Sequence, residues 1–398
     1  MRMLKLLLPA MACSIILFTG CKKDISDPTG TPTQIQTESI NAKRPTLSAA
    51  ELKAKFDQLV TALASENKSH LISNPNLVIN QEPGYRALVQ NATAVVPTPC
   101  NANTAISQWL DGELADWTND AFFYASDFAM FELPTYDAYV FENSSANQFF
   151  GKNGEYTQRL VKTFKDLKRF WNIQTADMVM VAMHGSMLQD RTKIIRTYIA
   201  VYGLSPALAA QLADFVLVLL DAFPEYRNGN HPIFTFNAFA IETFAFPPYG
   251  IIPDKIVMGD GIMEAFTAIG FGDVAPQAIL AHEFGHQIQF DLNLFGPNTP
   301  EATRRTELMA DAFAAYYLSH ARGASMQWKR VQQFLQVFFN IGDCAFTSSG
   351  HHGTPTQRMA AAEWAYNLAN DAQKQGHILT AQQFAILFDA QLPILVTQ

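Results

Sequence analysis

Three side chains with complementary chemistry occur within five residues, in the segment His282-Glu283-Phe284-Gly285-His286. Residues four positions apart share a face of an α-helix, so the imidazoles of His282 and His286 can reach one metal ion. Glu283 lies beside the first histidine, where its carboxylate can accept a proton from a metal-bound water. Apolar residues flank the motif at helical spacing, and this pattern predicts a largely buried helix.

A third candidate ligand lies downstream, in the segment Glu307-Leu308-Met309-Ala310-Asp311. A catalytic zinc ion usually has three protein ligands. Glu307 follows His286 by 21 residues, which leaves room for a loop and a second helix. Asp311 is one turn beyond Glu307 on the same face, where it could orient a ligand histidine through a hydrogen bond. The alternative is an ordinary acidic pair on a solvated face, but the many small apolar residues of this helix favour burial.

Together these two segments resemble the gluzincin metallopeptidases, the group that includes thermolysin. The E-x-x-A-D form is most similar to two bacterial branches, the neutral zinc metallopeptidases and the CAAX-prenyl-protease and BepA-like proteins. The resemblance covers about residues 150 to 370. It implies a zincin-like domain in which His282, His286 and Glu307 bind one Zn²⁺ ion. It also implies hydrolysis of peptide bonds, with Glu283 as the general base.

A segment before the motif, Asn237-Ala238-Phe239-Ala240, resembles the edge strand that lies over the active site in the same families. In those families the substrate backbone is held by strand addition. The resemblance therefore implies that Asn237 and Ala238 contact a peptide or protein substrate.

A segment after the motif, from His352 to Arg358, resembles the H-G-T-x-x-Q-R segment of these branches. The resemblance implies that His352 stabilises the oxyanion that forms during hydrolysis. His351 is its direct neighbour, and the sequence does not decide between the two histidines.

The first 20 residues have the pattern of a secretory signal peptide, with Arg2 and Lys5 before an apolar run over 6–18. That run is too short for a stable transmembrane span. The residues before Cys21 resemble a bacterial lipobox, which implies cleavage before Cys21 and lipidation of its thiol. The alternative is an ordinary signal peptide with an incidental cysteine. Both predict export, and the first predicts a membrane-anchored lipoprotein of the cell envelope, on the periplasmic side or at the cell surface.

These patterns divide the chain into a signal peptide (1–20), a lipid-anchored flexible tether (21–46), a helical and loop-rich N-terminal region of unknown role (47–150) and a zincin-like metallopeptidase domain (151–398). The tether is rich in polar residues and proline and has few large apolar residues. Ser48 and Glu51 have the spacing of a capping box and predict a helix start. Cys100 and Cys344 could form one disulfide, which the sequence does not establish.

We expect an α+β fold, mainly α-helical, with a small antiparallel sheet beside the H-E-x-x-H helix. Apolar runs predict strands over 177–183, 233–241 and 255–258, of which the last two are expected to pair antiparallel. Helical periodicity predicts one long helix over 105–131, followed by an irregular segment over 133–153. Further helices are predicted over 155–171, 190–202, 205–222, 328–339 and 356–371.

The chain has 398 residues, of which 48% are hydrophobic and 16% are charged, so it can bury a large core. A formal charge of −8 without a basic run argues against nucleic acid as a partner. Anionic lipid does not attract an acidic protein, so attachment to a membrane would depend on the lipid at Cys21.

The main functional hypothesis is a zinc metallopeptidase that acts on a peptide or protein substrate. A rival from another class is a lipid-anchored binding or chaperone-like protein that keeps the peptidase fold without turnover. A third is a zinc hydrolase that acts on a non-peptide amide. The sequence contains candidates for the metal ligands, for the general base and for the residue that stabilises the oxyanion, and their presence favours the peptidase. The sequence leaves the cleavage preference, endo- or exopeptidase action and the oligomeric state open.

Overall fold

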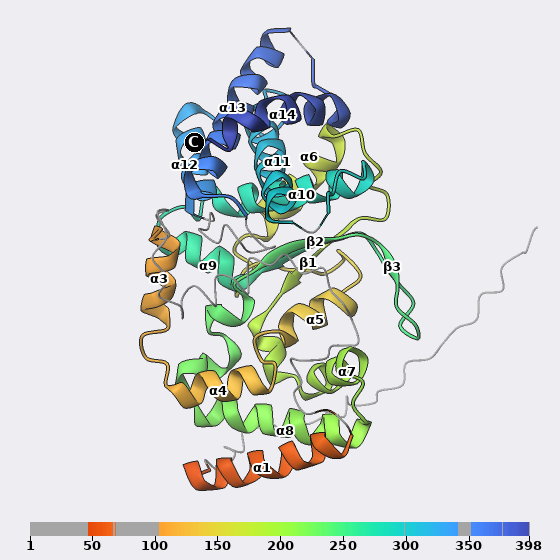
Figure 1. The fold of residues 1–398 in the computed structure, drawn as a ribbon, viewed down its shortest axis with the longest axis vertical. Coiled ribbons are helices and arrows are strands. Elements are labelled where there is room, and N and C mark those ends of the chain that lie inside the picture. Colours follow the sequence, from red (N-terminus) through yellow and green to blue (C-terminus); the bar gives the residue numbers. More distant parts are fainter. Residues whose placement is uncertain are drawn as a thin grey trace, which may run out of the picture. The chain divides into compact units, whose positions relative to one another are not determined.

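The fold is mainly helical, with two small sheets (Figure 1). The computed structural model describes residues 47–66, 68, 103–297, 299–340, 352–375 and 377–397. The described residues all belong to one compact unit. Several predicted features lie outside the described residues: the signal peptide (1–20), the tether (21–46), and Cys21, Cys100, Cys344 and His351.

The larger sheet has the strand order β1-β5-β2. Its strands are β1 (Val179–Met183), β2 (Ala238–Ile241) and β5 (Lys255–Gly259). β2 pairs antiparallel with β5, as predicted. β1 pairs parallel with β5, so the prediction of an antiparallel sheet is wrong and the sheet is mixed. A parallel pair needs a long crossover, and the chain between β1 and β5 supplies it with two α-helices, short 3₁₀ segments and three strands, of which β2 joins the same sheet.

Side chains cover the outer edge of β1. The N–H groups of Met180 and Ala182 donate to Ser145 Oγ at 2.8 Å and to Gln148 Oε1 at 3.0 Å. These two side chains take the place of a neighbouring strand. The second sheet is a short antiparallel pair, β3 (Phe244–Ala245) and β4 (Ile251–Ile252).

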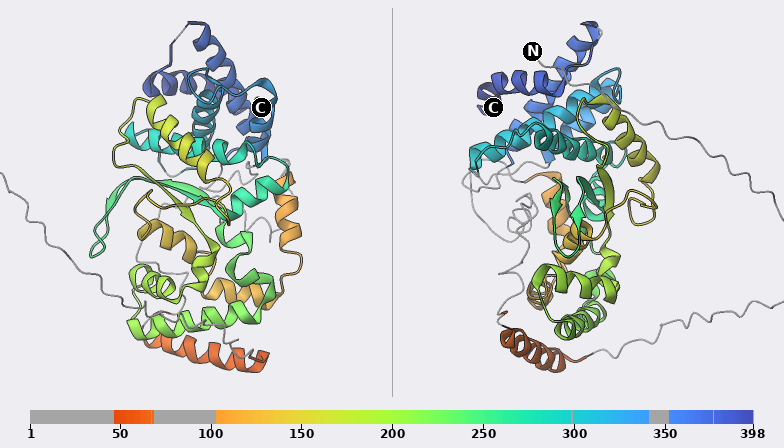
Figure 2. Two further views of the ribbon diagram at one scale, coloured as in Figure 1. Left: turned by 180° about the vertical axis from the view of Figure 1, so that it is seen from behind. Right: turned by 90° about the vertical axis from the view of Figure 1, so that its right-hand side faces the viewer.

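Helices pack on both sides of the larger sheet (Figures 1 and 2). On the upper side in Figure 1, α10 packs against β2 and β5 and also against α6 and α11. On the lower side, α5 packs against β1 and α7, and α8 packs against α7 and α1. The described helices are α1 (Ala49–Ser65), α3 (Ala105–Glu113), α4 (Asn119–Asp127), α5 (Leu133–Val140), α6 (Thr157–Phe170), α7 (Arg191–Tyr202), α8 (Pro206–Ala222), α9 (Asp260–Ala268), α10 (Ala275–Asp291), α11 (Pro300–Ser319), α12 (Trp328–Asn340), α13 (Pro355–Gln375) and α14 (Ala381–Leu395), with short 3₁₀ segments η1 (Gly185–Gln189), η2 (Pro224–Gly229) and η3 (Pro232–Thr235).

Most of the predicted helices are confirmed within a few residues. The capping box of Ser48 and Glu51 begins α1. Helix α7 begins after its N-cap Asp190 and ends at Gly203, whose φ of 65° is left-handed. Helix α14 follows a second capping box at Thr380, which the sequence analysis did not identify.

The predicted helix over 105–131 is wrong, because this segment forms two helices, α3 and α4. Thr118 begins the second helix, since its side chain accepts a hydrogen bond from Ala121 N at 3.1 Å. Trp117, just before this cap, is buried against His231 and Phe234. The spacing of the aromatic residues is compatible with one long helix or with two shorter ones. The N-cap at Thr118 favours two helices.

The predicted irregular segment over 133–153 is also wrong at its start, where the chain forms α5. Every residue of α5 is buried, and Pro134 lies in its first turn, where proline is tolerated. A helix that is buried on every side has no polar face, so its sequence shows no amphipathic period.

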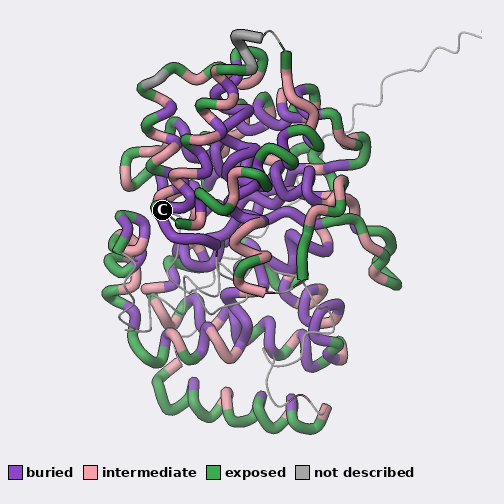
Figure 3. The backbone as a smooth tube through the Cα atoms, turned by 45° about the horizontal axis from the view of Figure 1, so that its top comes forward, coloured by how far each residue is buried: buried purple, intermediate pink, exposed green. Residues whose placement is uncertain are grey.

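Figure 3 shows the buried residues in purple, and they are concentrated in the middle of the fold. They include most of α10 and residues 306–319 of α11. No single helix among the described residues is long and apolar enough to cross a membrane. Helix α8 and the segment Pro224–Thr235 pass that test only as a pair bent by 108°.

His231, which precedes η3, is buried in a neutral form. Its Nε2 lies 3.0 Å from Glu113 O, and its Nδ1 accepts a hydrogen bond from Ile233 N at 3.2 Å. Burial lowers the pKa of His231 to about 4. The unfolded chain, with a histidine pKa of about 6.5, therefore binds more protons than the folded chain between these two values.

We expect His231 to destabilise the folded protein as the pH falls. Relative to His231→Gln, the free energy of unfolding of the wild type should decrease from pH 6.5 to pH 4 by about 1.4 kcal/mol per pH unit. Urea denaturation of both proteins over this range measures the difference. A difference that does not change with pH would contradict the assignment.

Candidate metal centre

His282, His286 and Glu307 converge where α10 packs against α11. His282 Nε2 lies 3.1 Å from His286 Nε2 and 3.4 Å from Glu307 Oε2. His286 Nε2 lies 3.5 Å from Glu307 Oε1. All three residues are buried, and one ligand atom from each lies within 4.8 Å of the other two. The three predicted ligands therefore form a group that could hold a metal ion.

The two helices approach closely because Gly285 has no side chain. A Cβ atom at this position would lie 2.9 Å from Ala310 Cα and 3.2 Å from Ala310 Cβ. Gly285 directly precedes His286, and Ala310 directly precedes Asp311. Contact between these two small residues therefore sets the separation of the ligands on α10 from those on α11.

Hydrogen bonds at Nδ1 orient both imidazoles. His282 Nδ1 lies 2.8 Å from Asp311 Oδ1, and His286 Nδ1 lies 2.8 Å from Gln289 Oε1. The amide nitrogen of Gln289 donates to Thr306 O at 2.8 Å, which turns the amide oxygen toward His286. A neutral imidazole that donates from Nδ1 presents a lone pair at Nε2.

Two such lone pairs face each other across 3.1 Å, beside a buried carboxylate. Without positive charge between them this arrangement is repulsive, and a cation bound by all three groups removes the repulsion. The donor set and its hydrogen bonds therefore fit a metal ion.

The electrostatics of the group agree with this fit. Burial alone would raise the pKa of Glu307, but the imidazoles of His286 and His352 hold it well below its usual range. Burial alone would lower the pKa of His282, but its hydrogen bonds with Asp311 and Glu307 raise it well above the usual range. Positive charge is therefore favoured at His282 Nε2, and either a proton or a metal ion can supply it.

A buried arginine holds Asp311 in place. Arg358 Nε donates to Asp311 Oδ2 at 2.6 Å, and Arg358 Nη2 donates to Asp311 Oδ1 at 2.7 Å. Nη2 also lies 3.7 Å from Glu307 Oε2. A bidentate pair of this kind fixes the plane of the carboxylate. Arg358 thus supports His282 through Asp311, as Gln289 supports His286.

The sequence analysis missed both supporting roles. Gln289 lies three positions after His286, so the two share a face of the helix, and this spacing could have identified it. Arg358 was noted only as the end of the segment that begins at His352. Its partner Asp311 lies 47 residues away, and no local pattern links the two.

Glu283 and His352 lie in the same buried region. Glu283 follows His282 in α10 and is 2% exposed. His352 is also buried, and it is close enough to Glu307 to lower the pKa of that carboxyl group. His352 thus lies near the ligand candidate Glu307, and Glu283 is the direct neighbour in sequence of the ligand candidate His282.

Strand β2 lies at the edge of its sheet and packs against α10. Gly259 N donates to Asn237 O at 3.0 Å, so the backbone of Asn237 pairs with β5. Because antiparallel pairs alternate, the main-chain groups of Ala238 and Ala240 point away from β5, toward the edge of the sheet at which no described strand pairs with β2. At the other end of β2, Gln287 donates to Ile241 O at 3.0 Å and to Lys255 O at 2.9 Å, which fixes this sheet to α10.

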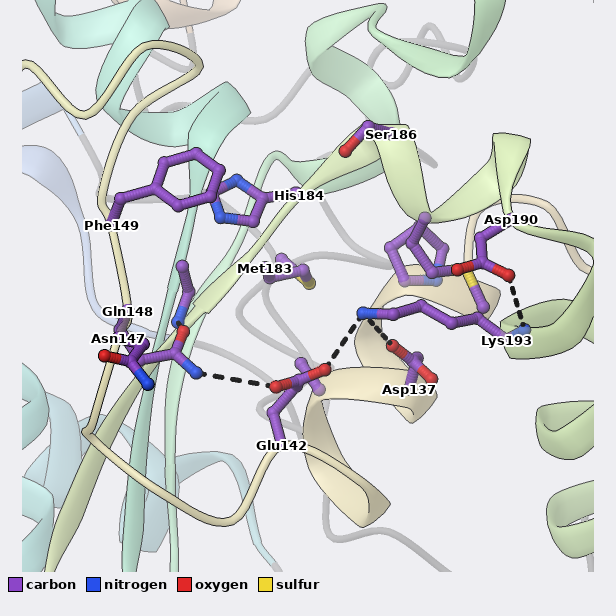
Figure 4. Close-up of a pocket in the computed structure, with 14 residues that line it drawn as sticks. Asp137, Glu142, Asn147, Gln148, Phe149, Met183, His184, Ser186, Asp190 and Lys193 are labelled. Carbon is purple, nitrogen blue, oxygen red and sulfur yellow. Dashed lines mark hydrogen bonds and ion pairs between the residues drawn. The ribbon is translucent and has the colours of Figure 1, made fainter. Parts of the chain in front are cut away.

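A separate cavity of about 260 Å³ lies near the end of β1 (Figure 4). His184 lines it, and its Nδ1 lies 2.8 Å from Asp260 Oδ2. The wall carries the carboxylates of Asp137, Glu142 and Asp190 and the ammonium group of Lys193. Lys193 Nζ lies 2.9 Å from Glu142 Oε1 and 3.4 Å from Asp137 Oδ2.

Comparisons of the chain with protein-family models, with curated proteins and with solved structures find no match.

Two glutamines of α10 test the orientation of His286. We expect Gln289→Leu to weaken metal binding about tenfold, because the loss of such a supporting hydrogen bond typically costs 10- to 100-fold in metal affinity. Gln287→Leu is the matched control. It should lower the free energy of unfolding by about 1–3 kcal/mol and leave the metal affinity near that of the wild type. Competition with a chromophoric chelator measures affinity, and equal affinities in both variants would refute the role of Gln289.

Proposed function

We propose that the chain is a zinc-dependent metallopeptidase. The observation that carries the proposal is the buried convergence of two imidazole nitrogens with the Glu307 carboxylate. Two histidines and one glutamate form a ligand set of catalytic zinc sites, which keep a further position open for water. Nitrogen donors also suit zinc better than calcium or magnesium, which prefer oxygen ligands. The H-E-x-x-H motif and the resemblance to gluzincins support the same activity.

A zinc ion in this site would activate a water molecule and polarise the substrate carbonyl. In the proposed reaction, Glu283 accepts a proton from the attacking water and then delivers it to the leaving nitrogen. His352 donates a hydrogen bond to the carbonyl oxygen as that oxygen gains negative charge. Asp311 and Gln289 keep the ligand imidazoles in their orientation throughout.

The position of β2 at the end of the strand order β1-β5-β2 supports a peptide or protein as the substrate. An extended peptide could pair with the main-chain groups of Ala238 and Ala240 as an additional strand. Asn237 would then contribute through its side chain, because its carbonyl is already paired with Gly259. We also propose that the protein is an envelope lipoprotein, held at a membrane by the lipid on Cys21.

A second candidate function has one observation in its favour. The residues of the centre are buried, since Glu283 is 2% exposed and both ligand histidines are 4% exposed. A lipid-anchored binding or chaperone-like protein that keeps the peptidase fold without turnover would have such a centre. The two candidates differ in whether the protein hydrolyses peptide bonds, and one experiment distinguishes between them.

We expect Glu283→Gln to abolish turnover, because the amide cannot accept the proton from the attacking water. The variant should retain zinc, because residue 283 is not one of the proposed metal ligands. A mixed peptide library, incubated with the unlipidated wild type or variant and analysed by mass spectrometry, measures cleavage, and a metal assay accompanies both. Cleavage by Glu283→Gln would refute the general-base role. Zinc in both proteins with cleavage by neither would favour the binding protein, and a folded wild type without zinc would refute the metal centre.

An exposed aromatic residue beside the centre indicates which substrates it would accept. Phe295 lies in the loop between α10 and α11 and is 42% exposed. Its ring centroid lies 4.6 Å from that of Phe290 and 6.5 Å from that of His286. In the proposed enzyme, this ring would form an apolar wall beside His286. We therefore propose that the enzyme prefers an apolar side chain next to the scissile bond.

Phe295→Ala should lower kcat/KM for such substrates about tenfold, the scale of a lost apolar contact in a specificity pocket. Substrates with glycine at the same position should be affected little. Phe149→Ala is the control, because Phe149 is 46% exposed but stacks on His184, away from α10. Equal losses for apolar and glycine substrates would show that Phe295 does not determine specificity.

A further inference from the structure

A cleft of about 590 Å³ lies between α6 and the chain segment that leads into β1, and its size is within the usual range of small-molecule sites. Its floor is apolar: Phe164, Met178 and Met180 line it and are buried. The two methionines are unbranched and flexible, so such a floor adapts to an alkyl chain without a fixed shape. Three cationic residues, Lys165, Lys168 and Arg169, also line the cleft.

The positive charge of these three residues is only partly compensated within the part of the chain that the structure describes. Lys165 has no ion pair there. Arg169 lies 3.7 Å from Asp166, whose other oxygen already binds Lys162 at 2.6 Å. This excess of positive charge occurs in a chain with a formal charge of −8.

Lys168 directs its ammonium group over the apolar floor. Its Nζ lies 5.1 Å from the centre of the Phe164 ring and makes a long hydrogen bond of 3.4 Å to Met178 O. Burial lowers the pKa of Lys168, and the exposed carboxylate of Asp177 only partly offsets this effect. An anion beside Nζ would stabilise the charge that burial destabilises.

The cavity near His184 lacks this combination. Its central ammonium, that of Lys193, is bound by Glu142 and Asp137, and polar groups make up much of its wall (Figure 4). An anionic ligand there would have to compete with these two carboxylates. The cleft beside α6 therefore suits a molecule with an anionic head and an apolar body.

We propose that the cleft beside α6 binds a single-chain anionic amphiphile such as a fatty acid. The head group contacts Lys165, Lys168 and Arg169, and the alkyl chain lies over the methionines and Phe164. A small inorganic anion would leave the apolar floor exposed to water, and the charges line a concave site rather than a flat surface that would face a bilayer.

This site is distinct from the metal centre and does not depend on the proposed peptidase activity. Phe164 lies with its ring centroid 6.4 Å from that of Phe284, and Thr163 Oγ1 lies 3.1 Å from Gln277 Nε2, so α6 packs directly on α10. Successive residues of a helix are rotated by about 100°. Phe284 therefore points away from both His282 and His286, and an occupant of the cleft lies behind the helix that carries these ligands.

The test is calorimetric titration of the purified protein with decanoate, hexanoate and decyltrimethylammonium. Decanoate should bind with saturation, at least about tenfold more tightly than hexanoate, because buried methylene groups contribute to its affinity. Decyltrimethylammonium, with the same chain length and the opposite charge, should not compete. In a separate experiment the protein is titrated with vesicles that contain phosphatidylglycerol. These vesicles should not bind through this cleft.

The double variant Lys165→Gln/Lys168→Gln should weaken decanoate binding about tenfold, the combined scale of two partly exposed ion pairs. The control Lys53→Gln/Lys55→Gln removes the same charge from α1 and should bind as the wild type does. Equal decanoate affinities in the two double variants would overturn the proposal, and so would equal affinity for the cationic amphiphile. Lysine-dependent binding that occurs with the vesicles alone would also overturn it.

Discussion

Two imidazole nitrogens held 3.1 Å apart in the protein interior are the constraint on which the rest of this site depends. A hydrogen bond at Nδ1 orients each ring: His282 is bonded to Asp311, and His286 is bonded to Gln289. Arg358 and the carbonyl of Thr306 hold these two partners in turn. A buried polar network of this kind is stable only when every member has its partner, so the supporting residues are part of the centre.

Three different faces of helix α10 contact three different neighbours. The ligand histidines face α11, Gln287 is bonded to the carbonyl groups of β2 and β5, and Phe284 packs toward α6. This use of all faces explains why its sequence shows little amphipathic contrast although the helix is central to the fold. It also means that the sheet edge, the ligands and the cleft beside α6 share one rigid element.

The sequence predicts those parts of the structure that depend on short spacings. The histidine pair, the spacing of Glu307 and Asp311, the capping box at Ser48 and the antiparallel pairing of β2 with β5 all follow from local patterns. The parallel partner of β1 and the contact of Arg358 with Asp311 join distant segments, and nothing local encodes them. Helix α5 was missed for another reason, because uniform burial removes the polar face by which a helix is recognised in sequence.

The contact between Gly285 and Ala310 has a consequence for the choice of ion. Ligands carried by side chains on separate loops can move apart to admit a larger cation. Here the ligands project from two helices whose backbones are almost in contact, so their separation has little freedom to increase. A calcium ion needs six to eight oxygen ligands at about 2.3–2.6 Å, whereas the group found among the described residues contains one carboxylate, that of Glu307. The absence of one side chain thus limits how far the three candidate ligands can move apart to admit a larger ion.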